Sequence, residues 1–413
     1  MLKFNNNTPF IEDTSLNDIL KVCETPFYIY SQNMITQKVE ITKKNLNNNI
    51  FFSVKSNSNQ AILKLMQNLD LGADVVSIGE LKRCLIAGFS PDKIIFEGVG
   101  KSKDDLLYAI QKNIRLINTE SLEEIKLLQI LANEKNKKVN IGVRLNPNID
   151  GQTISKISTG KKTDKFGIEI DEIGNIINLV KNSPDLNLIG ISCHIGSQIN
   201  KIEAYRNTFI EMKKAADKFV NAGIDIRHVD LGGGFHVQYK EDDPSLSIGD
   251  IKKELDTCFN NSSYELSFEP GRYLIAEAGI IITSIITIKQ NGGINYLIVD
   301  AGMNTLVRPA MYNAYHKVES INNKSKNKVA YAVAGPICES SDVFQRNVML
   351  PQQEIGDLLI IKDTGAYGKV MSSNYNTRLL PSEILVNKDL FGIIYSPDKI
   401  ERYIDEDIIP SWL

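Results

Sequence analysis

The stretch "IFFSVKSN" (50–57) opens the part of the chain that decides the fold, because a run of apolar β-forming residues ends there on Lys55. Strands that are buried on both faces of a parallel sheet read as continuous apolar runs. A lysine at the end of such a run lies where the sheet meets solvent or a pocket. Lys55 therefore either marks the point where the strand reaches solvent or belongs to a binding site.

Seven similar runs follow before about residue 270, and longer segments with the apolar spacing of helices separate them. Eight successive strand and helix units predict a (β/α)8 TIM barrel, because an open doubly wound sheet normally has fewer strands. The eight strand candidates are "IFFSVK" (50–55), "ADVVS" (73–77), "KIIFEG" (93–98), "IRLIN" (114–118), "KVNIGVRLN" (138–146), "LIGISCHIG" (188–196), "RHVDLGGG" (227–234) and "YELSFEPG" (264–271).

After about residue 270 the sequence changes to β-branched runs with turn signals between them and little helical periodicity. These runs are "IIITSIITIK" (280–289), "GINYLIVD" (293–300), "KVAYAVAG" (328–335) and "IGDLLIIKD" (355–363). We expect them to form a second, mostly β domain, which "FYIY" (27–30) joins from the N-terminal side. The predicted fold class is α/β, with a TIM barrel over residues 31–272 and a β domain built from residues 1–30 and 273–413.

The composition favours small-molecule chemistry. The chain has 413 residues, 42% of them hydrophobic, and a net charge of −3, which provides no basic surface for nucleic acid or an anionic membrane. Its N-terminus lacks an apolar core behind a basic start, and no segment approaches the ~20 apolar residues that span a bilayer. We therefore predict a cytoplasmic protein.

The cysteines and histidines do not suggest a metal site. The five cysteines are widely scattered and never spaced as CxxC, so reduced thiols are expected rather than a disulfide framework or a zinc site. The four histidines include no HExxH pattern. We expect no bound metal.

Four groups of polar or glycine residues end predicted strands, and in a barrel of this kind the active site lies at these carboxyl ends. They are Lys55, "HIGS" (194–197), "GGG" (232–234) and "EPGR" (269–272). Each alone has an ordinary explanation as a strand exit, a packed histidine or a tight turn. Together they place an amine, an imidazole, a carboxylate and a nest of backbone N–H groups on one rim.

That combination suits pyridoxal 5′-phosphate. Its aldehyde needs a lysine amine for a Schiff base, and its ring nitrogen needs a carboxylate that holds a proton there. The phosphate needs glycine N–H groups, and a flat imidazole can stack on the ring. A carboxylate at the nitrogen, Glu269, favours decarboxylation over racemisation. The P-loop-like "GVGKS" (98–102) is rejected as a nucleotide site, because the pattern requires glycine where Ile95 stands.

From about residue 25 to 400 the chain resembles the diaminopimelate decarboxylases, which belong to the alanine-racemase-like class of pyridoxal-phosphate enzymes. The resemblance rests on motifs that recur in order: "SVKSN" (53–57), "GADVVSIGE" (72–80), "STGKKTDKFGI" (158–168), "CHIGSQ" (193–198), "DLGGGF" (230–235), "FEPGR" (268–272), "DAGMNTLVRPAMY" (300–312), "GPICESSD" (335–342) and "GAYGKVMSSNYNTR" (365–378).

This resemblance implies roles for the matching residues. Lys55 would form the Schiff base, His194 would stack on the cofactor ring, and Glu269 would pair with the ring nitrogen. The residues around the phosphate would be Ser197, Gly233, Gly234, Gly271 and Tyr367. The resemblance also implies a homodimer whose active site is shared across the interface and completed by the β domain.

The resemblance also implies which residues bind and protonate the substrate. Cys338 would enter from the partner subunit and protonate the carbon that carbon dioxide has left. Glu339 would hold the distal ammonium group of the substrate. The distal carboxylate would be bound by Arg272, Arg308 and Tyr312, with Tyr367 also near the substrate, because a planar guanidinium makes bidentate bonds that lysine cannot match. The ordinary alternatives are a small buried cysteine at Cys338 and a structural ion pair at Arg308.

Two departures from the family pattern affect loops beside the phosphate. "HVQ" (236–238) stands where the family usually has a glycine and a proline, and "TRLLPSE" (377–383) lacks the usual second arginine-proline pair. The resemblance implies decarboxylation of meso-2,6-diaminopimelate to L-lysine, the last step of lysine biosynthesis. The alternatives are a decarboxylase of the same class for carboxynorspermidine, ornithine or arginine, and a catalytically silent regulatory homologue.

Overall fold

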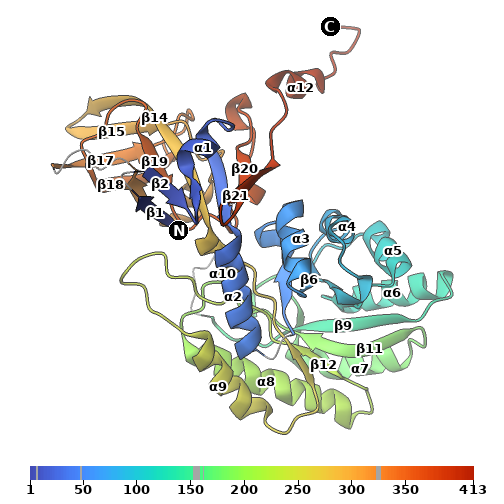
Figure 1. The fold of residues 1–413 in the computed structure, drawn as a ribbon. Coiled ribbons are helices and arrows are strands. Elements are labelled where there is room, and N and C mark those ends of the chain that lie inside the picture. The colour runs from blue at the N-terminus through green and yellow to red at the C-terminus, as the bar shows by residue number, and fades with distance from the viewer. Residues whose placement is uncertain (6–7, 47–48, 152–158, 161, 322–326) are drawn as a thin grey trace. The chain divides into compact units, whose positions relative to one another are not determined.

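The chain divides into two compact units. The computed structural model describes residues 1–5, 8–46, 49–151, 159–160, 162–321 and 327–413, so positions 158 and 161 of "STGKKTDKFGI" lie outside the described residues. The barrel unit comprises Lys38–Gln238 and Pro244–Tyr273, and the β unit comprises Met1–Gln37, Tyr239–Asp243 and Leu274–Leu413 (Figure 1).

The barrel unit contains eight parallel strands, each hydrogen-bonded to the next. They follow the chain in the order β5 (Phe51–Ser53), β6 (Gly72–Val75), β7 (Ile94–Phe96), β8 (Leu116–Thr119), β9 (Val139–Asn146), β11 (Leu186–Ser192), β12 (His228–Asp230) and β13 (Glu265–Ser267), and the short β10 (Ile168–Glu169) pairs with β9. A parallel bridge between Ile50 and Phe268 joins the last strand to the first, and the Phe51 N–H donates to the Phe268 carbonyl at 2.9 Å. All eight predicted strands and the TIM-barrel fold class are confirmed.

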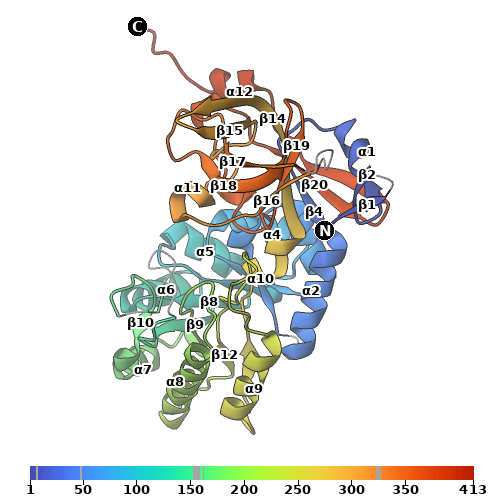
Figure 2. The ribbon, with the colours of Figure 1, turned by 90° about the vertical axis from the view of Figure 1, so that its left-hand side faces the viewer.

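Helices surround these strands (Figure 2). They are α3 (Gln60–Asn68), α4 (Ile78–Ala87), α5 (Lys103–Lys112), α6 (Leu122–Glu134), α7 (Ile173–Lys181), α8 (Ile202–Asn221) and α9 (Ile248–Phe259), while α2 (Gln32–Asn45) and α10 (Arg272–Ile275) each cross a unit boundary. Serine side chains cap four of the helices, at Ser77, Ser102, Ser121 and Ser247, by accepting a backbone N–H of the first turn. These caps fix where each helix begins after its strand.

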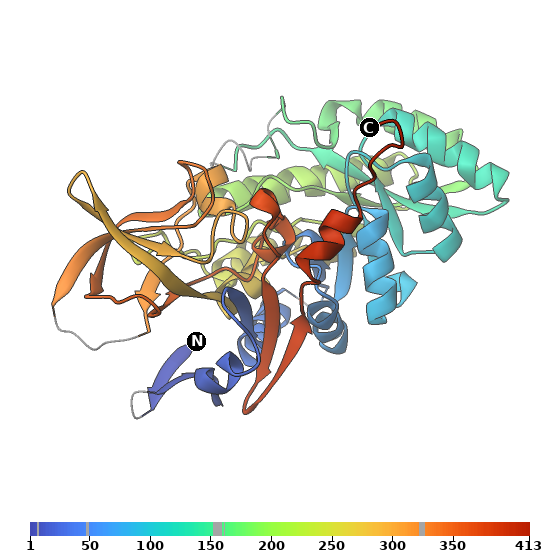
Figure 3. The same cartoon turned by 90° about the horizontal axis from the view of Figure 1, so that it is seen from above.

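The β unit is built on a mixed sheet in the order β18, β17, β15, β14, β4, β20, β21, in which β14 also pairs with β19 and β19 with β16. Most of these strands belong to the C-terminal part of the chain, which is coloured gold to red in Figure 3. The strands are β4 (Phe27–Ser31), β14 (Gly279–Asn291), β15 (Ile294–Val299), β16 (Val318–Ser320), β17 (Lys328–Ala334), β18 (Val343–Pro351), β19 (Leu358–Ile361), β20 (Ser382–Asn387) and β21 (Leu390–Tyr395). As predicted, β4 joins the sheet, antiparallel to β14 and parallel to β20.

Smaller elements complete the β unit. A three-stranded sheet of β1 (Leu2–Asn5), β2 (Thr8–Ile11) and β3 (Thr14–Ser15) lies at the N-terminus and is followed by α1 (Leu16–Leu20). Two further helices are α11 (Arg308–Tyr312) and α12 (Ile400–Asp405). One apolar cluster includes Ile11 and Leu16 from this N-terminal part and Ile29, Ile282 and Ile384 from the large sheet. The N-terminal residues therefore share the core of the C-terminal sheet.

None of the helices in the described parts of the chain is long and apolar enough to cross a lipid bilayer.

Replacing Ile29 by alanine should destabilise the β unit, because its side chain is fully buried in β4 between two neighbouring strands. We expect the free energy of unfolding to fall by about 2–5 kcal/mol, as for other large-to-alanine changes in cores. Urea unfolding would measure it. Ile288→Ala is the matched control, since its side chain is 37% exposed on β14, and it should cost less than about 1 kcal/mol. Equal losses in both variants would contradict a central position for β4.

Candidate active site

Lys55 lies directly after β5, in a single 3-10 turn over Val54–Ser56. Its amine is 3.3 Å from Oδ2 of Asp74, and its side chain is 35% exposed while that of Asp74 is fully buried. The same oxygen of Asp74 accepts a hydrogen bond from the Ser53 hydroxyl at 2.8 Å. The carboxylate thus orients an amine that remains accessible at the end of the strand.

Glu269 follows β13 and is 6% exposed, and its Oε1 has no hydrogen-bond partner among the described residues. Its backbone is fixed, because its N–H donates to the Gly232 carbonyl at 2.8 Å and its carbonyl accepts the Ser53 hydroxyl at 2.9 Å. Burial raises the pKa of this carboxyl group well above its usual value, and the nearby carboxyl groups of Asp230 and Asp74 add to the effect. A buried polar atom without a partner is costly, so this oxygen is suited to a ligand donor.

The glycines after β12 bring backbone close to backbone. A Cβ at Gly233 would lie 2.4 Å from the carbonyl oxygen of Glu269, and one at Gly234 would lie 2.2 Å from that of Gly196. Gly234 also has a φ of +79°, which favours glycine. At Gly271, a Cβ would meet the side chains of Ser53 and Ser56 at 2.9 Å. Without side chains, such backbone can approach a phosphate closely.

His194 follows β11 and contacts the same glycine segment, because the Gly233 N–H donates to its Nδ1 at 3.3 Å. Burial lowers the pKa of this histidine well below its usual value, with the positive charges of Lys55 and Arg144 adding to the effect. The ring is therefore neutral at pH 7, and the accepting Nδ1 leaves the proton on Nε2. A flat imidazole of this kind can stack on an aromatic ring.

Sequence reasoning missed a group of charged residues inside the barrel. The guanidinium of Arg144, on β9, lies 3.0 Å from Oε1 of Glu120 and 3.8 Å from Oε2 of Glu97, and all three residues are buried. Burial raises the pKa of Glu97, an effect that Arg144 opposes. A signal was available, because Glu97 follows the apolar residues of "KIIFEG" and Arg144 stands between Val143 and Leu145 in "KVNIGVRLN".

The lysine of "GVGKS" has a structural role. The amine of Lys101 donates to the carbonyl of Asn118 at 2.8 Å and pairs with Glu124 at 2.9 Å, and its side chain is almost fully buried. An amine held in this way is not presented to a nucleotide. This arrangement agrees with the rejection of a P-loop.

In the β unit, Arg308 begins α11 and is 6% exposed. Its Nε donates to Nε2 of His316 at 3.2 Å, and Nδ1 of His316 lies 2.8 Å from the carbonyl of Lys362, so the histidine carries its proton on Nδ1. The guanidinium also lies over the ring of Tyr239, 5.4 Å from its centroid. His316 and Tyr239 therefore orient Arg308, and sequence reasoning identified neither of them.

Cys338 and Glu339 lie in the loop of residues 335–342, between β17 and β18, and both are exposed. The alternative interpretation of Cys338 as a small buried residue is wrong, because the buried cysteines are Cys23, Cys84 and Cys193. Exposure leaves the thiol of Cys338 accessible for chemistry.

The remaining predicted residues are distributed between the units. In the barrel unit, Nε of Arg272 donates to the hydroxyl of Ser197 at 3.2 Å, which links two of the predicted positions. In the β unit, Tyr312 is half-buried at the end of α11. Tyr367 is also half-buried and has a φ of +54°, in the left-handed region that non-glycine residues rarely adopt. The predicted site residues thus form two sets, one in each unit.

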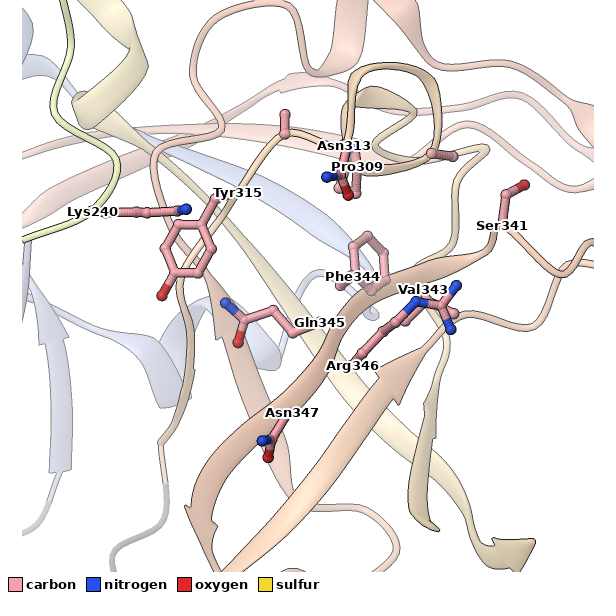
Figure 4. A pocket seen from close by; sticks show the side chains of 12 residues that line it. Lys240, Pro309, Asn313, Tyr315, Ser341, Val343, Phe344, Gln345, Arg346 and Asn347 are labelled. Carbon is pink, nitrogen blue, oxygen red and sulfur yellow. The ribbon is translucent and has the colours of Figure 1, made fainter. Parts of the chain in front are cut away.

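A cavity of about 480 Å³ opens in the β unit beside α11 and the start of β18 (Figure 4). Its lining includes Lys240, Asn313, Tyr315 and Arg346, and the Lys240 amine lies 5.4 Å from the centroid of the Tyr315 ring. None of the predicted site residues lines it. The cavity therefore adds no support to the predicted substrate site.

Comparison with known proteins identifies the family. Residues 32–276 match the family model described as "Pyridoxal-dependent decarboxylase, pyridoxal binding domain". The chain belongs to the pyridoxal-dependent decarboxylases. Among curated relatives, the diaminopimelate decarboxylase of Aquifex aeolicus is 34% identical over 98% of this chain and 97% of its own length. The diaminopimelate decarboxylase of Campylobacter jejuni is 38% identical, over 92% of this chain and 95% of its own length.

Solved structures agree with this family. A crystal structure of diaminopimelate decarboxylase from Helicobacter pylori, complexed with L-lysine, is 35% identical, has a TM-score of 0.90 and matches 94% of this chain and 99% of that chain. The enzyme from M. jannaschii, also in complex with L-lysine, is 32% identical, with a TM-score of 0.94 over 100% of this chain and 99% of that one. The family identified from sequence motifs is confirmed.

His228 makes barrel stability depend on pH. Burial lowers its pKa to about 3, with the charge of Arg115 adding to the effect. Between pH 6.5 and about 3, the unfolded chain therefore binds a proton that the folded chain does not, so stability is lost as the pH falls. From pH 7 to pH 5 this residue should cost about 2 kcal/mol. We expect urea unfolding of His228→Gln to show a smaller loss than the unchanged protein over this interval, and equal losses would contradict the buried, neutral state.

Proposed function

We propose that this protein decarboxylates meso-2,6-diaminopimelate to L-lysine and carbon dioxide, the last step of lysine biosynthesis, with pyridoxal 5′-phosphate as its cofactor. The observation that carries the proposal is the buried carboxyl group of Glu269, at the same end of the barrel strands as Lys55. In the part of the chain that the structure describes, one of its oxygens has no hydrogen-bond partner. The choice of substrate is supported by relatives named diaminopimelate decarboxylase that match nearly the whole chain, and by two such structures that contain L-lysine.

The residues of the barrel unit fit this cofactor. Pyridoxal phosphate supplies, when bound, an aldehyde that condenses with amines and a ring that withdraws the electron pair left by carbon dioxide. Lys55 would hold the aldehyde carbon, and the neutral ring of His194 would lie against the cofactor ring. The proposed phosphate contacts are Ser197, Gly233, Gly234, Gly271 and Tyr367. The close backbone contacts at these glycines support this role, because they leave no room for side chains.

Glu269 would hold a proton at the ring nitrogen. Its raised pKa means that the buried carboxylate binds a proton more tightly than an exposed one, so a single proton would be held between it and the ring nitrogen. Its unpartnered oxygen would receive the ring N–H and so gain the hydrogen bond that it lacks in the protein alone. Glu269 would in this way support the electron withdrawal that the cofactor supplies when bound.

The distal end of the substrate carries both a carboxylate and an ammonium group, and the proposed binding residues have the complementary charges. Arg308 and Arg272 would bind the distal carboxylate, with Tyr312 and Tyr367 beside them. Support for Arg308 comes from His316, which bonds its Nε and fixes the plane of the guanidinium. A guanidinium with a fixed plane loses little entropy when it forms two parallel hydrogen bonds. Glu339 would bind the distal ammonium group.

Cys338 would deliver a proton to the carbon atom from which carbon dioxide has departed. Its exposure in the 335–342 loop supports this role, since a thiol that must reach a substrate cannot be buried in its own subunit. We propose a homodimer in which the partner subunit's Cys338 and the partner subunit's Glu339 complete each site. The cytoplasmic location predicted from the sequence stays a prediction.

A substrate panel tests the proposal. The cofactor-loaded protein would be incubated with meso- and L,L-diaminopimelate, ornithine, arginine and carboxynorspermidine, and carbon dioxide release and product chirality would be measured. We expect L-lysine from the meso isomer alone, because only that substrate presents a D-configured carbon and an amino-acid-shaped distal end. Lys55→Ala is the control and should abolish turnover, because no other amine at that position can bind the cofactor.

Two outcomes would contradict the proposal. Turnover of a different substrate alone would keep the cofactor site but overturn the roles of Arg308 and Glu339. Absence of turnover with every substrate, together with absence of a visible absorption band after incubation with the cofactor, would favour a catalytically silent protein.

Cys338→Ala should separate cofactor binding from proton delivery. The visible absorption of bound cofactor should remain, whereas turnover should fall by about 100-fold or more, the usual contribution of a positioned proton donor. Stopped-flow absorbance and product formation would measure the two effects. Cys258→Ala, which alters a half-buried thiol on α9, is the matched control and should turn over normally. Normal turnover of Cys338→Ala would remove Cys338 from this role.

A further inference from the structure

Three loops of the β unit meet around Cys338 and Glu339: residues 301–306, 335–342 and 372–378. The buried carboxylate of Asp342 accepts the N–H of Met303 at 2.6 Å and that of Ile337 at 2.7 Å, which ties the second loop to the first. The N–H of Ser373 donates to the carbonyl of Asn304 at 2.9 Å, which ties the third loop to the first. The first loop therefore holds the other two in place.

The 372–378 loop contacts both residues that the proposed function places at the substrate. The hydroxyl of Tyr375 donates to Oε1 of Glu339 at 2.6 Å. The N–H of Cys338 donates to Oδ1 of Asn376 at 3.1 Å. Two consecutive residues of one loop thus hold two consecutive residues of the other.

The backbone of the 372–378 loop has a defined conformation. Asn376 and Thr377 have φ values of +55° and +52°, a left-handed turn that asparagine tolerates better than most residues. Ser372 begins the loop with a hydrogen bond from its hydroxyl to the carbonyl of Lys369 at 2.6 Å. The turn fixes the backbone beside Tyr375, whose side chain is 43% exposed and is held by the hydrogen bond from its hydroxyl to Glu339.

A neutral donor suits a carboxylate that must bind an ammonium group. Glu339 is exposed, and its side-chain partner among the described residues is the neutral hydroxyl of Tyr375. The hydrogen bond to Glu339 is the first cause of a raised pKa at Tyr375, which keeps the phenol protonated. Tyr375 thus restricts the rotamers of Glu339 without competing for its charge.

We propose that Tyr375 is a specificity-determining positioning residue, which holds the Glu339 carboxylate ready for the distal ammonium group of the substrate. This inference rests on the proposed function, because it gives Glu339 that role. A preorganised carboxylate loses less side-chain entropy when the substrate binds. Tyr375 therefore favours substrates that carry a distal ammonium group and has no effect on those that lack one.

The test compares meso-2,6-diaminopimelate with D-2-aminopimelate, which keeps the distal carboxylate and lacks the distal amine. For Tyr375→Phe, the ratio of kcat/KM for the two substrates should fall by about three- to tenfold, through a raised KM for diaminopimelate. Glu339→Gln should lower the ratio further. The double variant should match Glu339→Gln, because Tyr375 acts through Glu339. Tyr296→Phe, on β15, is the matched control and should leave the ratio unchanged.

The outcomes separate this inference from the function on which it rests. If Glu339→Gln lowers the ratio and Tyr375→Phe does not, the role of Tyr375 is overturned while that of Glu339 stands. If the kcat/KM ratio of the double variant is lower than that of Glu339→Gln, Tyr375 acts on the substrate by another route and the inference fails. If Glu339→Gln leaves the ratio unchanged, the ammonium-binding role of Glu339 and the inference fail together.

Discussion

The buried carboxyl group of Glu269, one oxygen of which has no hydrogen-bond partner among the described residues, is the constraint that sets the chemistry of the barrel unit. Burying a polar atom without a partner costs free energy. Glu269 bears this cost because its backbone is fixed at a buried position. Its backbone bonds to Gly232 and Ser53 hold it at the junction where the last strand returns to the first. The barrel must therefore close for the group to lie where it does. A ligand that supplies the missing hydrogen-bond donor would offset this cost, so the group is suited to ligand binding.

The charged groups inside the barrel also affect the protonation states of the site. Asp74 and Glu269 lie in an interior that also holds Glu97 and Glu120, and Arg144 pairs with the latter two. Paired charges of this kind are weak evidence of stability, because desolvation offsets much of the attraction. Their effect on the site is clearer, since Arg144 helps to keep His194 neutral, and the carboxyl groups of Asp74 and Glu97 help to raise the pKa of Glu269. The protonation states of the site thus depend on residues that never need to touch a substrate.

The sequence predicted the strands of the barrel well because each is a short apolar run with a helical segment after it. It was less informative for the β unit, where the polar residues Gln345, Arg346 and Asn347 interrupt β18 (Val343–Pro351) and its exposed positions follow no regular alternation. The ends of the predicted strands likewise indicated that Lys55, Glu269 and the glycines are site residues. His316 and Tyr375 were missed, because a residue that orients a side chain distant in sequence leaves no periodic or spacing signal.

By itself, the sequence determined the fold class, the order of the barrel strands and the family, because these depend on local periodicity and on motifs that stay together along the chain. Only the tertiary structure decided which groups meet. Asp74 lies beside Lys55, and Tyr375 reaches Glu339 across 36 residues. Burial likewise depends on the assembled barrel, so the raised pKa of Glu269 and the lowered pKa of His194 could not be read from the chain. The physical reason is that desolvation and hydrogen bonding are set by neighbours in space, which folding brings together.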